Sequence, residues 1–209
     1  MELTYHGANC VRIVTKQVHI IVDDNLKALG LPTISKPGDI LLYTGTNLKQ
    51  ESKEPKLVID QPGEFEVSSV SIQGIATRAH IDEADSQNAT IFKLIINDIR
   101  VAVMGHIHPD LNDNQLEAIG TIDVLIIPVG GNGYTLDAIG ALKIIKKVEP
   151  KIIIPTHFAD GKVKYEVPQA ELDDALKNMS IEAKETVDKL KLKSSELPEA
   201  MELIVLSRQ

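Results

Sequence analysis

The chain has 209 residues, of which 43% are hydrophobic and 25% are charged, which suits one globular domain with a core. The formal net charge of −8 argues against a nucleic-acid partner, because phosphate backbones are bound by basic faces. Aromatic residues make up only 3% of the chain, so we expect the core to be aliphatic.

Cysteine use and the N-terminal stretch indicate the compartment. The single cysteine, Cys10, excludes an intramolecular disulfide and fits a reducing environment. The first ten residues lack the basic and apolar segments of a signal peptide, and the apolar runs stop short of membrane-spanning length. We therefore expect a cytoplasmic protein with no membrane partner.

The first half of the chain is typical of β-structure. Short β-prone runs are separated by turn residues, and Asn97-Asp98 predicts the turn of a hairpin. The expected strands cover residues 2–6, 10–15, 18–23, 39–43, 57–60, 64–66, 69–79, 90–96 and 99–104.

In the second half, expected strands at 124–129, 151–155 and 201–207 alternate with helices. Asn112-Asp113 predicts the start of a short helix that ends at Gly120. Thr135 is placed to cap a longer helix, and Pro168 to open a third that runs to about Lys177. This pattern predicts two stacked sheets with helices outside, in one domain spanning residues 1–209.

Three histidines directly follow expected strands: His80, His106 and His157. Neutral imidazole is a common ligand of transition metals, and three imidazoles with an open fourth position make a zinc-type site. Each histidine taken alone fits a hydrogen-bonded structural role better than a ligand role. Their shared position predicts a common site. The string His106-Ile107-His108-Pro109-Asp110 imitates a His-x-His-x-Asp ligand motif, but Pro109 indicates a turn, which disfavours coordination by both histidines.

A glycine-rich turn precedes the longer helix. Backbone amides of Gly130, Gly131 and Asn132 could cradle an anionic substrate. The same residues also suit a strand-to-helix turn that needs positive φ angles.

Five segments stand in a recognisable order: IIVDDNL at 20–26, QPGEFEVSSVSIQGIATRAH at 61–80, VAVMGH at 101–106, TIDVLIIPVGGNGYTLDA at 121–138 and VEPKIIIPTHF at 148–158. In this order they resemble the metallo-β-lactamase-fold superfamily, and within it the branch of ascorbate-phosphate lactonase-like and other metal-dependent hydrolases. The resemblance implies an α/β fold, a four-layer αββα sandwich, and a capacity to form homo-oligomers.

The chain departs from that family at its metal motif. Family members carry a His-x-His-x-Asp-His loop, whereas this chain reads LYTGTNLKQ at 42–50. The family's Gly-His near the N-terminus is Gly7-Ala8 here, and its metal-bridging Gly-Asp is Gly105-His106. A carboxylate can bridge two metals, but a neutral imidazole offers one free nitrogen to one metal. Conventional two-metal hydrolysis is therefore not expected.

Two functions remain open. The first is a mononuclear hydrolase of phosphoesters or lactones, with one Zn or Mn ion at His80, His106 and His157. The second is a non-catalytic, metal-free binding or assembly protein on the same scaffold. Nuclease activity, which also occurs on this fold, is disfavoured by the net charge. In each case the expected ligand is a small molecule of unidentified class.

Overall fold

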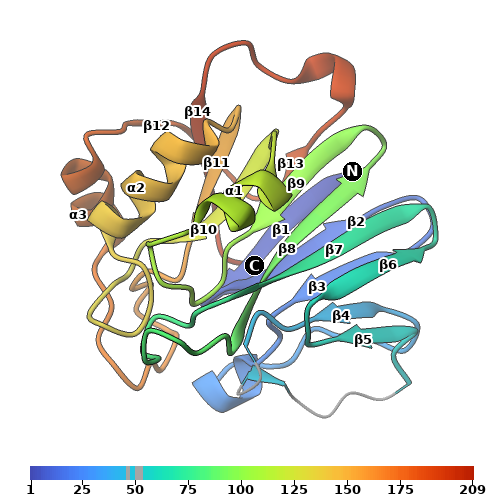
Figure 1. Cartoon of the computed structure of the whole chain (residues 1–209), viewed down its shortest axis with the longest axis horizontal. Helices are drawn as coiled ribbons and strands as arrows, with labels where there is room; N and C mark the ends of the chain where they lie inside the picture. Colours follow the sequence, from blue (N-terminus) through green and yellow to red (C-terminus); the bar gives the residue numbers. More distant parts are fainter. Residues whose placement is uncertain (46–47, 50–53) are drawn as a thin grey trace.

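Two β-sheets pack face to face at the centre of the fold (Figure 1). The structure is a computed structural model that describes residues 1–45, 48–49 and 54–209. Within these residues the smaller sheet has six strands in the order β13-β1-β2-β3-β4-β5, and the larger has eight in the order β12-β14-β11-β10-β9-β8-β7-β6. The predicted pair of stacked sheets with helices outside is confirmed.

The strands are bounded as follows: β1 Glu2–Gly7, β2 Cys10–Val14, β3 His19–Val22, β4 Ile40–Leu42, β5 Leu57–Ile59, β6 Gly63–Val67, β7 Val70–Thr77, β8 Ala89–Ile96, β9 Ile99–Val103, β10 Val124–Pro128, β11 Ile152–Thr156, β12 Ala183–Val187, β13 Leu190–Lys191 and β14 Glu202–Leu206. The helices are α1 Asp113–Ile119, α2 Ala138–Val148 and α3 Leu172–Met179, with 3₁₀ turns at Leu26–Leu29 (η1) and Ser194–Glu196 (η3).

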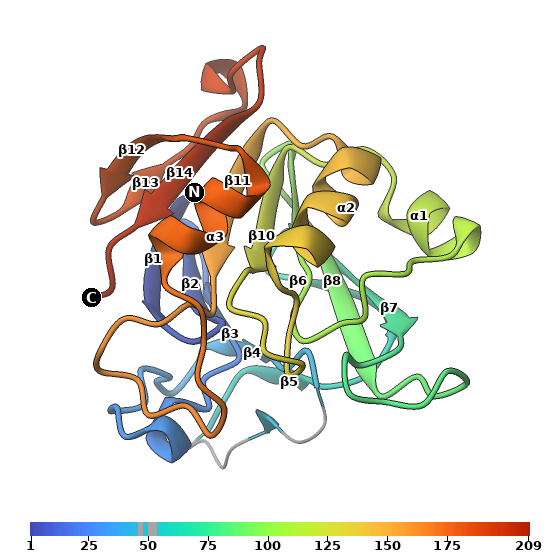
Figure 2. The same cartoon turned by 90° about the vertical axis from the view of Figure 1, so that its left-hand side faces the viewer.

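The core lies between the sheets and under the helices. In β1 the buried and partly exposed residues alternate, because one face of this strand meets the core. In β10 and β11 every residue is buried, since the other sheet covers one face and helices cover the other. Figure 2 shows α1, α2 and α3 together on the outer side of the eight-stranded sheet.

A thin layer covers the outer face of the six-stranded sheet. Leu26 from η1 packs there with Cys10, Ile21, Leu41 and Tyr43, in a cluster separate from the main core. These residues alternate along their strands with core-facing ones such as Ile20 and Leu42. The expected α/β fold with two stacked sheets is thus confirmed, and within the described residues the second outer layer consists of a 3₁₀ turn and loops where an α-helix was expected.

Three local expectations differ from the structure. The N-cap of α2 is Asp137, whose carboxylate accepts from the amide of Gly140, whereas Thr135 is buried ahead of the helix. The third helix begins after Glu171, three residues beyond Pro168. The charged stretch after it contains β12 and β13, which the sequence pattern missed because these short strands carry mostly exposed residues.

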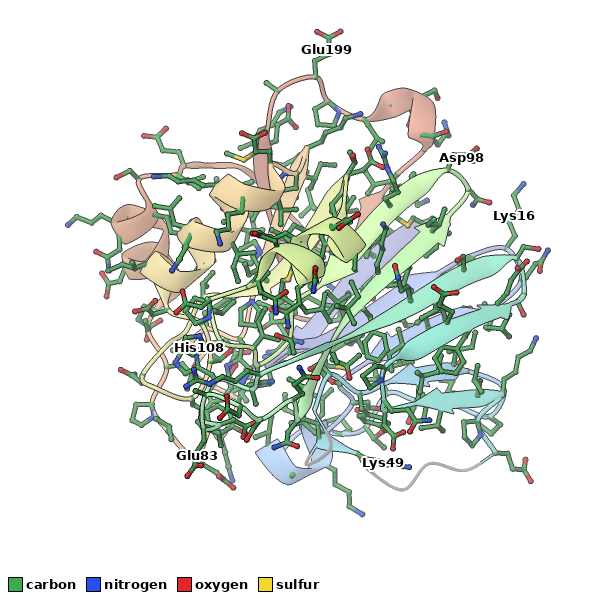
Figure 3. The ribbon with its side chains drawn as sticks, in the orientation of Figure 1. Lys16, Lys49, Glu83, Asp98, His108 and Glu199 are labelled. Atoms are coloured by element: carbon green, nitrogen blue, oxygen red, sulfur yellow. The ribbon has the colours of Figure 1, made fainter. Side chains whose placement is uncertain are left out.

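The parallel direction of three strands places the loops that carry the candidate site residues at one end of the fold. The strands β9, β10 and β11 are parallel, so the segments that follow them emerge at the same edge of the sheet. In Figure 3, His108 and Glu83 lie among these loops, whereas Asp98 and Lys16 lie at the hairpin turns of the opposite end. None of the described helices has both the length and the apolar character needed to span a membrane.

Candidate functional site

Backbone bonds bring the segments of His80 and His106 together. The amide of His80 donates to the carbonyl of His106 over 2.8 Å, and that of His108 donates to Arg78 over 3.0 Å. Ala79 and Ile107 form an isolated antiparallel bridge between the same two segments. The loop after β7 and the loop after β9 are therefore held side by side, as their positions after strands predicted.

His106 stands at the centre of the site and lacks hydrogen bonds for its ring. Its centroid lies 4.6 Å from that of His157 and 5.2 Å from that of Tyr134, both in edge-on geometry. Both ring nitrogens are buried, and neither has a hydrogen-bond partner in the part of the chain that the structure describes. Burial, and then the neighbouring imidazoles of His157 and His80, hold the pKa of His106 well below its usual value. His106 is therefore a neutral imidazole whose donor and acceptor nitrogens are both unsatisfied among the described residues.

His157 is fixed by its backbone and by one side chain. It adopts a φ of 54°, and its amide donates to the carbonyl of Ala8 over 2.7 Å. Its Nδ1 lies 3.1 Å from Oε1 of Gln169, and its ring centroid lies 4.8 Å from that of Tyr165. Only 2% of the residue is exposed, and this burial lowers the pKa of His157 to about 4, although the hydrogen bond to Oε1 of Gln169 acts in the opposite direction. His157 is therefore also neutral near pH 7.

Tyr134 separates two cavities that border these imidazoles. One, of about 400 Å³, is lined by residues that include Thr44, His80, His106 and Tyr134. The other, of about 280 Å³, is lined by residues that include Tyr134, His157, Tyr165, Glu166 and Gln169. A larger hollow of about 510 Å³ lies between α2 and α3 and has no histidine in its wall, so it lies apart from this chemistry.

A buried polar network supports the floor of the site. The carboxylate of Asp23 accepts from Asn9 Nδ2 at 2.7 Å and from the amide and hydroxyl of Thr44 at 2.7 and 2.6 Å. Asn9 in turn accepts from the hydroxyl of Thr156 at 2.7 Å. Desolvation outweighs these donors and raises the pKa of Asp23 to about 6. The network joins the ends of β3, β4 and β11 beneath the histidines.

Among the described residues, no three His, Cys, Asp or Glu side chains are placed to hold a metal ion. His106 and His157 are in contact, but the His80 ring lies beside His108, with Nδ1 3.3 Å from the carbonyl of Ile107. Imidazole nitrogens suit a divalent metal, whereas the placement of these three rings does not gather three donors at one point. The three-histidine ligand set is not preformed here and stays a prediction.

The segment in place of the family's metal loop supplies no imidazole. Thr44 is fully buried and bound to Asp23, and Gly105 packs so closely on it that an added Cβ would overlap the threonine side chain. Thr46 and Asn47 lie outside the described residues. Thr44 and Gly45 line the cavity beside His80 and His106, and neither can offer an imidazole to a metal.

One amide of the predicted glycine-rich cradle is engaged within the loop, and the neighbouring residues hold the turn through a carbonyl and a side chain. The amide of Gly131 donates to the carbonyl of Leu136 over 3.0 Å, and the carbonyl of Gly130 accepts from Ala170 over 2.8 Å. The side chain of Asn132 donates to the carbonyl of Pro168. These contacts favour the turn interpretation, with Gly130, Gly131 and Asn132 shaping the loop that ends in Tyr134.

Several residues of the site were not singled out from the sequence. Tyr134 and Tyr165 flank His157, and Gln169 bonds it, yet a lone Tyr or Gln in a loop carries no spacing signal. Asp23 was not singled out as a site residue either. Its place directly after the apolar strand β3 was the one available signal that it enters the core.

Comparisons with known proteins identify the family of the chain. A family model described as "Beta-lactamase superfamily domain" matches residues 2–157. A UPF0173 metal-dependent hydrolase of Thermoplasma acidophilum is 26% identical, over 76% of this chain and 83% of that protein. A second protein of that name, from Carboxydothermus hydrogenoformans, is 44% identical over a stretch of 43 residues, which spans 21% of this chain and 19% of that protein.

Solved structures extend the similarity to the whole fold. A Thermotoga maritima protein, named as a Zn-dependent hydrolase of the metallo-β-lactamase superfamily, is 25% identical with a TM-score of 0.74, covering 100% of this chain and 99% of that one. A protein of Parabacteroides distasonis, named as a metal-dependent hydrolase, is 17% identical with a TM-score of 0.63, covering 99% and 93%. The chain belongs to the beta-lactamase superfamily and has the metallo-β-lactamase fold.

Proposed function

We propose that this chain is a hydrolase-like enzyme whose reactive site consists of His106, His157 and His80 and uses one metal ion at most. The observation that carries the proposal is the pair of buried, unpartnered nitrogens on His106. A buried polar atom without a partner costs on the order of 1–3 kcal/mol, so a ligand that bonds it would be stabilised there. The relatives named as metal-dependent hydrolases support a divalent ion as one such ligand.

The residues of the chain set the limits of this chemistry. One Zn or Mn ion bound at the imidazoles would supply a Lewis acid that polarises an electrophilic substrate. His106 takes the place at which the family resemblance expects a bridging carboxylate, so a second ion lacks its shared ligand. Tyr134, between the two cavities, is placed to contact the substrate. We propose phosphoesters or lactones as the substrate classes.

A second candidate function is metal-free binding of a small molecule at the same site. It is favoured by a specific observation, since no three metal-donor side chains converge among the described residues. In this case the unpartnered nitrogens of His106 would bond polar atoms of the ligand directly. The two candidates share the residues and differ in metal content and turnover.

The test is hydrolysis of phosphoester and lactone panels, with and without added Zn²⁺ or Mn²⁺. The His106→Ala variant is compared with His19→Ala, a matched histidine control at the start of β3, where the ring contacts Arg12 and Asp39 at the opposite end of the strand from the site. The proposal predicts metal-dependent turnover that is lost in His106→Ala and kept in His19→Ala. Turnover that survives His106→Ala would contradict the proposed site. Binding of panel compounds without turnover in the wild type would favour the second candidate.

A further inference from the structure

The amide of Gln169 is held at both of its ends. Its Nε2 donates to the carbonyl of Val167 over 2.8 Å, and its Oε1 lies 3.1 Å from Nδ1 of His157. The reversed orientation would set the amide oxygen against the carbonyl oxygen of Val167, two acceptors with no proton between them. Gln169 is nearly buried, so water cannot easily replace either bond. The Val167 carbonyl therefore determines that the Gln169 oxygen faces the ring.

A fixed acceptor beside Nδ1 also determines which ring nitrogen of the imidazole carries the proton. The neutral ring carries one N–H donor and one lone pair, and an oxygen facing Nδ1 requires the proton to be there. Nε2 then carries the lone pair, so Nε2 is the atom that can accept a proton from a ligand or bind a metal ion. Free histidine prefers the opposite form, with the proton on Nε2. The contact with Gln169 would thus hold His157 in its less common neutral tautomer.

Gly130 makes this arrangement sterically possible. A Cβ at position 130 would overlap both the carbonyl oxygen of His157 and Oε1 of Gln169. The carbonyl of Gly130 also accepts from the amide of Ala170, the residue after Gln169. The turn after β10 is therefore built against the His157–Gln169 pair, in addition to forming a strand-to-helix connection.

We propose that Gln169 is a positioning residue that keeps His157 in the Nδ1–H tautomer and presents Nε2 to whatever binds in the site. Its role toward a metal or substrate rests on the proposed function, whereas the tautomer itself does not. A sequence search for metal ligands passes over it, because an amide side chain in a loop after the last site histidine has no motif around it.

The test is long-range ¹H–¹⁵N correlation of the histidine rings at about pH 8, where His157 is neutral. The His157 signals are assigned from their loss in His157→Gln. Wild type is expected to show predominantly Nδ1–H at His157. Gln169→Leu, which keeps the size but removes the acceptor, should shift the ring predominantly to Nε2–H, and Gln169→Glu, which keeps an acceptor, should retain Nδ1–H. Gln115→Leu is the matched control, because it removes a glutamine that donates to the backbone carbonyl of Ala76 instead. It should leave the tautomer of His157 unchanged.

Wild-type His157 in the Nε2–H form would overturn the proposal, as would an unchanged Nδ1–H signal in folded Gln169→Leu. A Zn²⁺ titration then separates this inference from the proposed function. If the site takes the ion, Gln169→Leu should weaken its affinity by about 10- to 100-fold. If wild type takes no ion while the tautomer is as expected, the metal-dependent function fails and the positioning role stands.

Discussion

The buried carboxylate of Asp23 should make the protein lose stability as pH rises through the mildly acidic range. Two effects oppose each other at this residue, since desolvation favours the protonated form and three hydrogen-bond donors favour the charged form. Desolvation prevails and raises the pKa from 3.8 to about 6. The folded protein then holds this proton more tightly than the unfolded chain, so the free energy of unfolding falls between about pH 4 and pH 6. A shift of about 2 pKa units corresponds to about 3 kcal/mol.

The measurement is urea unfolding of wild type and Asp23→Asn at several pH values across this window. Because the other titrating groups are common to both proteins, their contributions largely cancel in the difference between the two unfolding free energies. The stability of wild type relative to Asp23→Asn should fall by about 3 kcal/mol from about pH 4 to about pH 7. A relative stability that rises with pH would show that the donors of Asn9 and Thr44 outweigh desolvation, and would refute this reasoning.

Three further predictions concern stability. Gly130→Ala should lower the free energy of unfolding by about 1–3 kcal/mol, because the added Cβ overlaps the His157 carbonyl. Urea unfolding measures this loss, and unchanged stability would contradict the close packing of this turn. Arg100→Ala should lower the free energy of unfolding by about 2–3 kcal/mol, because it removes two side-chain hydrogen bonds, of 2.8 and 2.9 Å, from the buried Asp123. A loss below about 0.5 kcal/mol in the same assay would contradict this reasoning. Lys143→Ala removes an exposed ion pair with Asp110 and should change the free energy of unfolding by less than about 1 kcal/mol. A larger loss would show that this pair is more than a surface contact.

Much of the fold could be read from the sequence because its signals are local. Asn97 and Asp98 both adopt positive φ angles, as the predicted hairpin turn requires. Asn112 caps α1 with a complete capping box, and Gly120 ends the helix as expected. β10 and β11 were recognisable as continuous apolar runs. In each case the residue that determines the structure lies within a few positions of the element it shapes.

The site was predictable in its residues and less so in its geometry. Strand-end position correctly indicated that His106 and His157 would meet, because parallel strands deliver their following residues to one edge. It could not indicate that His80 would turn toward His108, since a rotamer depends on packing from loops far apart in the chain. The contact between Gln169 and His157 is equally hidden, because it needs the turn at Gly130 to bring two loops together.

The metal stoichiometry of protein purified without chelator tests the central claim most directly. The protein is equilibrated with Zn²⁺ or Mn²⁺ and free ion is removed. We expect at most one equivalent of bound ion per chain in wild type, and this ion should be lost in His106→Ala and kept in His19→Ala. Two equivalents would contradict the single-metal site, and so would one equivalent that survives His106→Ala. A wild type without bound ion would exclude the metal-dependent hydrolase and leave metal-free binding at His106 and His157.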